Sequence, residues 1–190
     1  MTRSQGMRVV AVLVVVAAAA WLVFFLWDGS TTPDVGTPRR IRHVAQPAGP
    51  NPSESAQMVC APEAQSELAS ALGATTTAVT EPTWVDHDYS CRYMYPDGSM
   101  AMSVKELSSR AETSAYFASL RAQLGEAERL TGVAQGAFVT TNGSLVLRKD
   151  YKVLLVDTSG LPEPFGNGYK TRDQVAVGVG MTVLGCWTGA

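Results

Sequence analysis

The three cysteines of the chain, Cys60, Cys91 and Cys186, are its most distinctive chemical groups. No two of them form a Cys-x-x-Cys pair, so nothing supports a thioredoxin-like redox site. Three thiols allow one intramolecular disulfide and leave one cysteine over. We expect Cys60 to pair with Cys91, because this bond would join the first helix of the domain to its first hairpin. The alternative pairs Cys91 with Cys186 and leaves Cys60 free.

A second group of reactive side chains surrounds His87, the only histidine after residue 57. Asp86 and Asp88 flank it, a composition that suits a general base with its carboxylate or part of a metal site. Adjacent residues point in different directions, however, and no second histidine is available to complete a ligand set. We interpret the tripeptide as a polar loop before a strand. A metal-handling or hydrolytic envelope enzyme that uses His87 and nearby carboxylates is the alternative.

Three methionines, Met94, Met100 and Met102, carry thioethers of the kind that bind Cu(I). On a strand Met94 faces away from the other two in the expected hairpin, so core packing explains them better. The chain contains no Gly-x-Ser-x-Gly elbow, no Ser-x-x-Lys pair and no Walker sequence. We therefore predict no catalytic residue, no metal ligand and no cofactor, and hence a non-enzymatic domain.

An unbroken apolar run over residues 9–27 predicts that the chain is anchored in a membrane. At about 1.5 Å per residue it forms a helix of about 28 Å, which matches a hydrocarbon core of about 30 Å. Arg3 and Arg8 precede the run and Asp28 follows it, which predicts a cytoplasmic N-terminus. The alternative is a signal peptide cleaved near Ala18–Ala20, but the apolar run continues beyond that point.

The chain then divides into four parts: a cytoplasmic N-terminus at 1–8, a single-pass anchor at 9–27, a proline-rich disordered linker at 28–57 and an extracytoplasmic domain at 58–190. That compartment is oxidising, so a disulfide can persist there. From residue 58 onward fourteen acidic residues outnumber ten basic ones. A mildly acidic domain argues against a nucleic-acid partner.

Local signals predict the elements of the domain. A helix begins at Pro62 and ends at Gly73, and residues 75–80 are extended. Asp97-Gly98 predicts a tight hairpin that pairs Tyr95 with Met100, Tyr93 with Met102 and Cys91 with Val104. These six residues share the apolar face of the sheet.

A second helix begins at the capping box Ser109–Glu112 and ends at Gly125. Strands follow at 137–141, 144–148 and 151–157, and then a loop at 158–170. The last segment, 172–187, is assigned to a helix, although its alternating valines also fit a strand. This order predicts an α+β domain, an antiparallel sheet with helices packed on one face.

Four segments of the outer domain resemble a group of uncharacterised actinobacterial membrane-anchored proteins: Cys60–Pro62, Cys91–Gly98, 148–157 and Leu184–Gly189. The resemblance implies a small extracytoplasmic α+β domain with no established activity. Our leading hypothesis is a tethered domain that binds an envelope protein or cell-wall component, with Phe165 and Tyr169 as its contact surface. A sensor or an accessory subunit of an envelope complex is a further alternative.

Overall fold

The computed structural model describes residues 45–168 and 170–188. The predicted membrane helix at 9–27 and the N-terminus at 1–8 lie outside them. No helix within the described ranges is long and apolar enough to cross a membrane. The helices are α2 (Glu54–Gln57), the 3-10 helix η1 (Met58–Cys60), α3 (Pro62–Leu72), α4 (Arg110–Leu124) and α5 (Arg172–Thr188). The strands are β1 (Ala78–Val79), β2 (Thr83–Val85), β3 (Asp88–Tyr95), β4 (Gly98–Glu106), β5 (Glu126–Leu130), β6 (Ala137–Thr140), β7 (Leu145–Lys149) and β8 (Lys152–Asp157).

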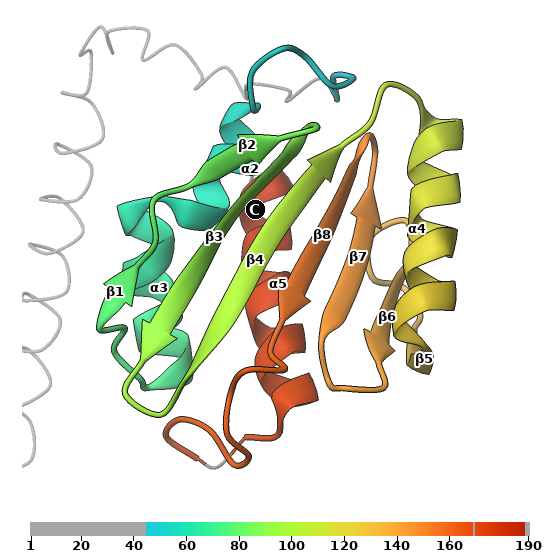
Figure 1. Cartoon of the computed structure of the whole chain (residues 1–190). Coiled ribbons are helices and arrows are strands. Elements are labelled where there is room, and N and C mark those ends of the chain that lie inside the picture. Colours follow the sequence, from blue (N-terminus) through green and yellow to red (C-terminus); the bar gives the residue numbers. More distant parts are fainter. Residues whose placement is uncertain (1–44, 169, 189–190) are drawn as a thin grey trace, which may run out of the picture. The chain divides into compact units, whose positions relative to one another are not determined.

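These strands form one antiparallel sheet of eight, which confirms the predicted α+β class for the described part of the chain. Their order across the sheet is β1-β3-β4-β8-β7-β6-β5, and β2 pairs with β3 (Figure 1). The chain leaves β4, passes through α4 to the far edge and returns as the meander β5 to β8. This return places β8 beside β4.

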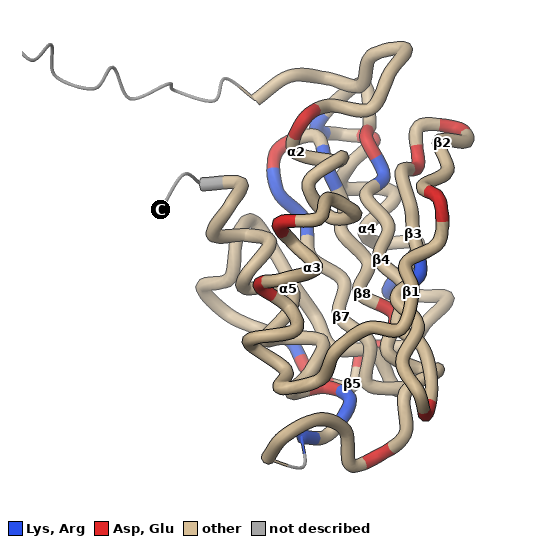
Figure 2. The backbone as a smooth tube through the Cα atoms, turned by 90° about the vertical axis from the view of Figure 1, so that its left-hand side faces the viewer, with Lys and Arg blue, Asp and Glu red and all other residues tan. Residues whose placement is uncertain are grey.

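The helices cover both faces of the sheet, which corrects the prediction that they pack on one face. Helices α3 and α5 lie on the same side of the strands (Figure 2), where Val179 joins the larger core. Helix α4 packs on the other side, where Phe117 and Val153 belong to a second core. Both Val153 and its neighbour Leu154 are buried, so β8 is apolar on its two faces and needs a cover on each.

The first hairpin has a register two residues away from the predicted one. The structure pairs Tyr95 with Gly98 and Tyr93 with Met100, so Pro96-Asp97 forms the loop. Proline suits the first loop position because its ring fixes φ at about −65°. A shift of two residues leaves every side chain on its predicted face. That face is buried as expected: Cys91, Tyr93, Tyr95, Met100, Met102 and Val104.

All three long helices lie where the sequence predicts them. Gly73 ends α3 in a left-handed conformation with φ of 62°. Ser109 Oγ accepts the Glu112 amide at the start of α4, at 3.1 Å. The ambiguous segment forms the helix α5, and there Gly180 has a packing role. A Cβ at this position would lie 2.1 Å from Leu145 Cδ2, so any larger residue would displace the Leu145 side chain between α5 and the sheet.

The linker predicted over 28–57 ends earlier than expected, because residues 45–57 pack against the domain. We call residues 45–57 the strap. The indole of Trp187 donates to the Ser55 carbonyl at 2.8 Å, and the indole of Trp84 donates to the Pro50 carbonyl at 3.0 Å. Ala56 is completely buried. The strap itself has few large apolar residues, so its composition predicts a disordered segment. The side chains that hold it belong to tryptophans distant in the sequence.

A buried carboxylate also holds the strap. Glu106 is 4% exposed, and both the amide and the hydroxyl of Ser53 donate to it. Lys152 Nζ lies 3.7 Å from the same carboxylate. Glu106 is therefore satisfied within the fold, since a buried charge requires such partners. We assign it a structural role.

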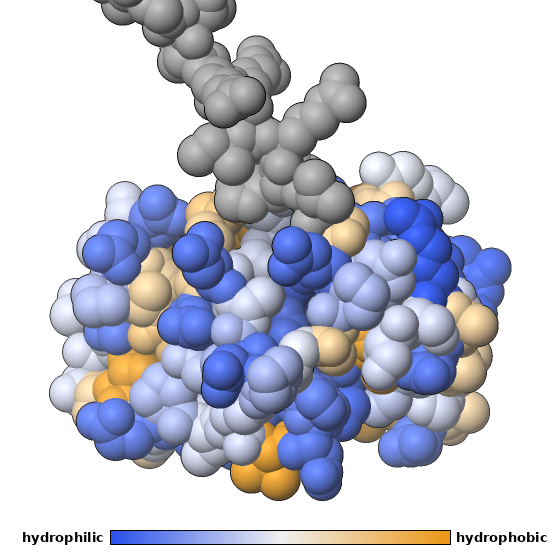
Figure 3. Space-filling view, turned by 90° about the horizontal axis from the view of Figure 1, so that it is seen from above, coloured by the Kyte–Doolittle hydropathy of each residue, from blue (hydrophilic) through white to orange (hydrophobic). Residues whose placement is uncertain are grey.

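One face of the domain is largely polar. On the face seen from above, hydrophilic residues predominate and hydrophobic ones form small separate patches (Figure 3). Residues after 44 include fifteen acidic and ten basic side chains, so this part of the chain is net negative.

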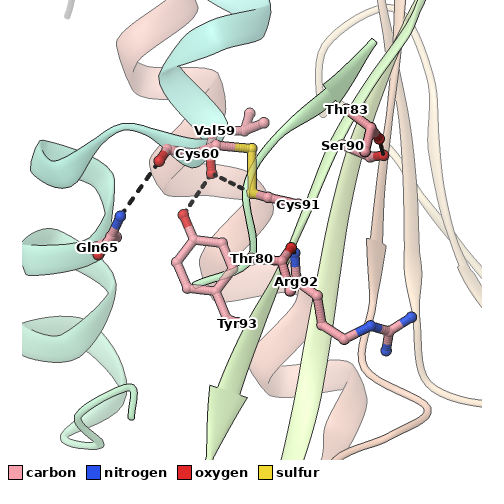
Figure 4. Close-up of a disulfide and its surroundings, with 9 residues drawn as sticks. All are labelled: Val59, Cys60, Gln65, Thr80, Thr83, Ser90, Cys91, Arg92 and Tyr93. Carbon is pink, nitrogen blue, oxygen red and sulfur yellow. Dashed lines mark hydrogen bonds between the residues drawn. A yellow bond between two sulfur atoms is a disulfide. The ribbon is translucent and has the colours of Figure 1, made fainter. Parts of the chain in front are cut away.

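A disulfide joins Cys60 at the end of η1 to Cys91 on β3, the pair favoured from the sequence (Figure 4). Cys186 is free and half-buried. The Tyr93 hydroxyl donates to the Val59 carbonyl at 2.5 Å, beside the bond. Burial raises the pKa of this hydroxyl, which keeps it a donor. The segment before α3 is thus fastened to the sheet covalently and by hydrogen bonds.

Candidate functional site

A cleft of about 510 Å³ lies between α4 and the turn that joins β5 to β6. Its walls come from α4, the end of β5, residues 131–137 and β7. Three of its lining residues are arginines, Arg121, Arg129 and Arg148, and none is acidic. We call it the arginine cleft.

An aromatic ring positions two of these arginines. The Phe117 ring of α4 has the Arg121 guanidinium 5.3 Å from its centroid and the Arg148 guanidinium 5.5 Å away. Arg121 also lies 5.6 Å from the ring of Phe138 on β6. Such cation–π contacts are worth about 0.5–1 kcal/mol or more each and keep planar guanidinium groups in place. The two cations are therefore held in spite of their mutual repulsion.

Arg148 is fixed further by hydrogen bonds at both ends of its fork. Its Nη1 donates to Ser114 Oγ at 2.5 Å, and its Nη2 donates to the Gln135 carbonyl at 2.7 Å. Its Nε is buried and has no hydrogen-bond partner among the described residues. Arg148 thus links α4 to the turn, and its guanidinium keeps N–H donors beyond the two that these hydrogen bonds use.

The third arginine shares a carboxylate with Arg121. Glu126 lies at the start of β5, with Oε2 2.6 Å from Arg121 Nε and Oε1 2.9 Å from Arg129 Nε. The Arg121 contact is an ion pair without hydrogen-bond geometry. The Arg121 side chain is 37% exposed and that of Arg129 is 60% exposed, so both remain within reach of a ligand. Three cations against one carboxylate leave local positive charge on an acidic domain.

The turn beside the arginines has an unusual backbone. Ala134 has φ of 48°, a left-handed conformation that non-glycine residues adopt at a cost of about 1–3 kcal/mol. Gln135 holds this turn in place: its side chain donates to Asp150 Oδ1 at 3.0 Å and accepts the Asp150 amide at 2.9 Å. The surrounding structure therefore fixes the wall of the arginine cleft in a conformation that the sequence alone does not favour.

Guanidinium groups in this arrangement bind oxyanions. Arginine presents planar forks of N–H donors that match carboxylate and phosphate oxygens. A fixed ring and fixed turn reduce the ordering needed on binding. The arginine cleft can thus hold one anionic group, with apolar lining from Leu130 and Val133 for the body attached to it.

His87 does not take part in the arginine cleft. It lies exposed in the turn between β2 and β3 with φ of 60°, and its ring meets Trp84 edge-on at 5.5 Å. Asp88 instead faces Lys105 and Ser103. No group of three or more metal-ligating side chains occurs within residues 45–168 and 170–188.

Two aspartates have opposite electrostatic environments. Desolvation raises the pKa of Asp88, and Lys105 and Ser103 offset this only in part. Burial alone would raise the pKa of Asp157 too, but hydrogen bonds from Ser159 and Ser144, with the charge of Arg92, lower it overall. Both shifts arise from the fold and lie outside the arginine cleft.

These shifts predict opposite effects of two conservative substitutions. A lowered pKa means that Asp157 stabilises the fold above its unfolded pKa of about 3.9, and this contribution is lost as pH falls through the folded value. Asp157→Asn should therefore destabilise the protein at pH 7 by about 1–2 kcal/mol, with a smaller effect near pH 3. The raised pKa of Asp88 means that its ionised form opposes folding, so Asp88→Asn should stabilise at pH 7.

Thermal unfolding of the full chain in neutral detergent, at pH 7 and at lower pH, measures both effects. Shifts of the same sign at pH 7 would contradict these assignments.

The predicted contact surface at Phe165 and Tyr169 needs correction. Phe165 is only 7% exposed, and its ring packs edge-on against Tyr95 with centroids 4.9 Å apart. The loop folds back on itself, since the amides of Phe165 and Lys170 each donate to the other's carbonyl. Tyr169 lies outside the described residues. Phe165 is therefore part of the core rather than an exposed anchor.

The arginine cleft has no recognisable signature in the sequence. Its three arginines come from a helix and two strands, and their spacing of eight and nineteen residues matches no local motif. One partial signal exists: Phe117 and Arg121 stand one helical turn apart on α4. Arg148 enters through the sheet pairing, which the sequence does not display.

Comparison with known proteins does not supply a function. No family model, curated protein or solved structure matches this chain. A function must therefore be inferred from the chemistry of the arginine cleft.

Proposed function

We propose that this chain is a membrane-tethered, extracytoplasmic binding domain whose arginine cleft takes an anionic group of an envelope component. The chain would act by binding rather than by catalysis. The single observation behind the proposal is the set of three arginines in a cleft without acidic lining residues, two of them stacked on Phe117.

The proposed location rests on the sequence together with the disulfide. The apolar run at 9–27, with basic residues before it, suits a single-pass anchor with a cytoplasmic N-terminus. The Cys60–Cys91 bond suits an oxidising compartment. The resemblance to membrane-anchored actinobacterial proteins agrees with both. The ligand would then be an anionic protein, lipid or polymer of the envelope of a high-GC Gram-positive bacterium.

Binding is favoured over hydrolysis or metal handling for a specific reason. A hydrolytic centre on His87 would need converging carboxylates within hydrogen-bond reach. His87 is exposed on a turn and packs against Trp84, while Asp88 faces Lys105. The arginine cleft, by contrast, has the fixed cations that recognition needs but no acid–base pair beside them.

The proposal predicts that Glu126→Gln strengthens anion binding. Glu126 competes with a ligand for Arg121 and Arg129, so the neutral amide releases both cations. Partly exposed pairs of this kind are worth roughly 0.2–1 kcal/mol each, so the release of both gives a gain of about twofold to thirtyfold in affinity. Isothermal titration calorimetry with inorganic phosphate measures it.

Glu128→Gln is the matched control, since Glu128 lies on the same strand and is not among the residues that line the cleft. It should leave phosphate affinity unchanged. Unchanged or weaker binding by Glu126→Gln would count against the arginine cleft as the anion site.

A further inference from the structure

A second concave site lies between α3 and the C-terminal half of α5. This groove has a volume of about 310 Å³. Residues of η1 and α3 form one wall and α5 forms the other. Its floor and walls are mainly apolar: Met58, Val59, Ala61, Ala64, Leu68 and Val183. We call it the α3–α5 groove.

Negative charge borders the α3–α5 groove. Glu63 and Glu67 stand one turn apart on α3 and both line it. Both are exposed, and neither carboxylate forms an ion pair within the described ranges. Helix α3 has no basic residue, and α5 has no charged residue after Asp173 (Figure 2). An apolar groove thus has two unpaired carboxylates at its edge and no neighbouring cation on either helix.

We propose that the α3–α5 groove docks a basic amphipathic helix of a partner protein. Its apolar side chains would enter the groove, and a Lys or Arg one turn away would pair with Glu63 and Glu67. Walls made by helices, with an apolar lining between them, suit this mode of recognition. A volume of about 310 Å³ lies at the lower limit for small-molecule pockets and fits side chains better than a whole ligand. The carboxylates would repel anionic lipid headgroups.

Cys186 offers a direct reporter of occupancy. The chain has three cysteines and two of them form the disulfide, so Cys186 is its one free thiol. Its side chain lines the α3–α5 groove. A docked helix should therefore shield it from alkylation.

The test uses the full chain in phosphatidylcholine nanodiscs and two synthetic helical peptides. Both peptides carry leucines on one face, and the other face carries lysines in one and glutamates in its twin. The lysine peptide, added at about ten times its Kd, should slow alkylation of Cys186 by N-ethylmaleimide about tenfold, because only the unoccupied fraction reacts. The glutamate peptide should give no protection.

Matched variants separate docking from general attraction to the nanodisc. Glu63→Gln with Glu67→Gln should raise the Kd of the lysine peptide about threefold to tenfold. Glu81→Gln with Glu128→Gln removes the same charge elsewhere and should leave the Kd unchanged. Equal effects of the two double variants, protection by both peptides, or no protection by either would overturn the proposal. Alkylation that is slower in nanodiscs than in neutral detergent before any peptide is added would also overturn it, since it would indicate a lipid chain in the groove.

Discussion

Replacement of Arg148 by glutamine is expected to weaken phosphate binding by about tenfold to a hundredfold. Arg148 is the best-fixed cation of the arginine cleft, since Phe117, Ser114 and Gln135 all hold it. A hydrogen bond to a charged group is worth about 1.5–3 kcal/mol, which corresponds to that loss of affinity. Calorimetric titration of the full chain with phosphate, in neutral detergent, measures the change.

Two further variants show whether the loss is specific. Arg148→Lys keeps the charge but lacks the planar fork, so it should bind phosphate more weakly than the native protein and better than Arg148→Gln. Arg110→Gln removes a cation from the same helix as Arg121, at a position outside the cleft, and should leave phosphate affinity unchanged. Equal losses of phosphate affinity in Arg148→Gln and Arg110→Gln would mean that phosphate responds only to the net charge of the protein.

Removal of the Cys60–Cys91 bond is expected to destabilise the protein by about 3–4 kcal/mol. The bond closes a loop of 31 residues, and the chain-entropy model assigns such a loop this stabilisation. It also fastens η1 to β3, where both cysteines are buried. Denaturant unfolding of Cys60→Ser with Cys91→Ser, compared with the native chain, measures the loss.

Cys186→Ser is the matched control, because it removes a half-buried thiol that forms no bond. It should change stability by less than about 1 kcal/mol. A larger effect of Cys186→Ser than of the double substitution would mean that the structural disulfide is not Cys60–Cys91 in the folded protein.

The helices could be predicted because local signals specify them. The capping box at Ser109–Glu112 and the glycine at position 73 act within one or two turns of the chain. The buried face of the first hairpin was also within reach, since alternation alone determines it. Its register was not, because Pro96 and Gly98 both compete to define the turn.

The position of α4 on the second face of the sheet could have been predicted from the apolar residues of two strands. Strands β7 and β8 contain consecutive apolar residues, as in 145–147 and 153–156. Such runs indicate strands covered on both faces. The expectation of helices on one face overlooked this pattern, and the structure places α4 over the second face.

Neither the arginine cleft nor the packing of the strap could be predicted from the sequence, and the reason is the same for both. Each joins residues that are far apart in the chain, such as Ser55 with Trp187 and Phe117 with Arg148. Such pairings follow from strand order, which composition and periodicity do not reveal. Phe165 was predicted to be exposed because its loop is rich in proline and glycine. In the structure its ring packs against Tyr95, and this tertiary contact buries it.

A phosphate titration of the isotope-labelled full chain, followed residue by residue with amide NMR, tests the anion-binding proposal most directly. Saturable shifts with an apparent Kd of about millimolar are predicted at residues 114–121, 129–137 and Arg148, where the arginine cleft lies. Shifts that never saturate, that spread evenly over the domain, or that centre on residues 86–88 would contradict it.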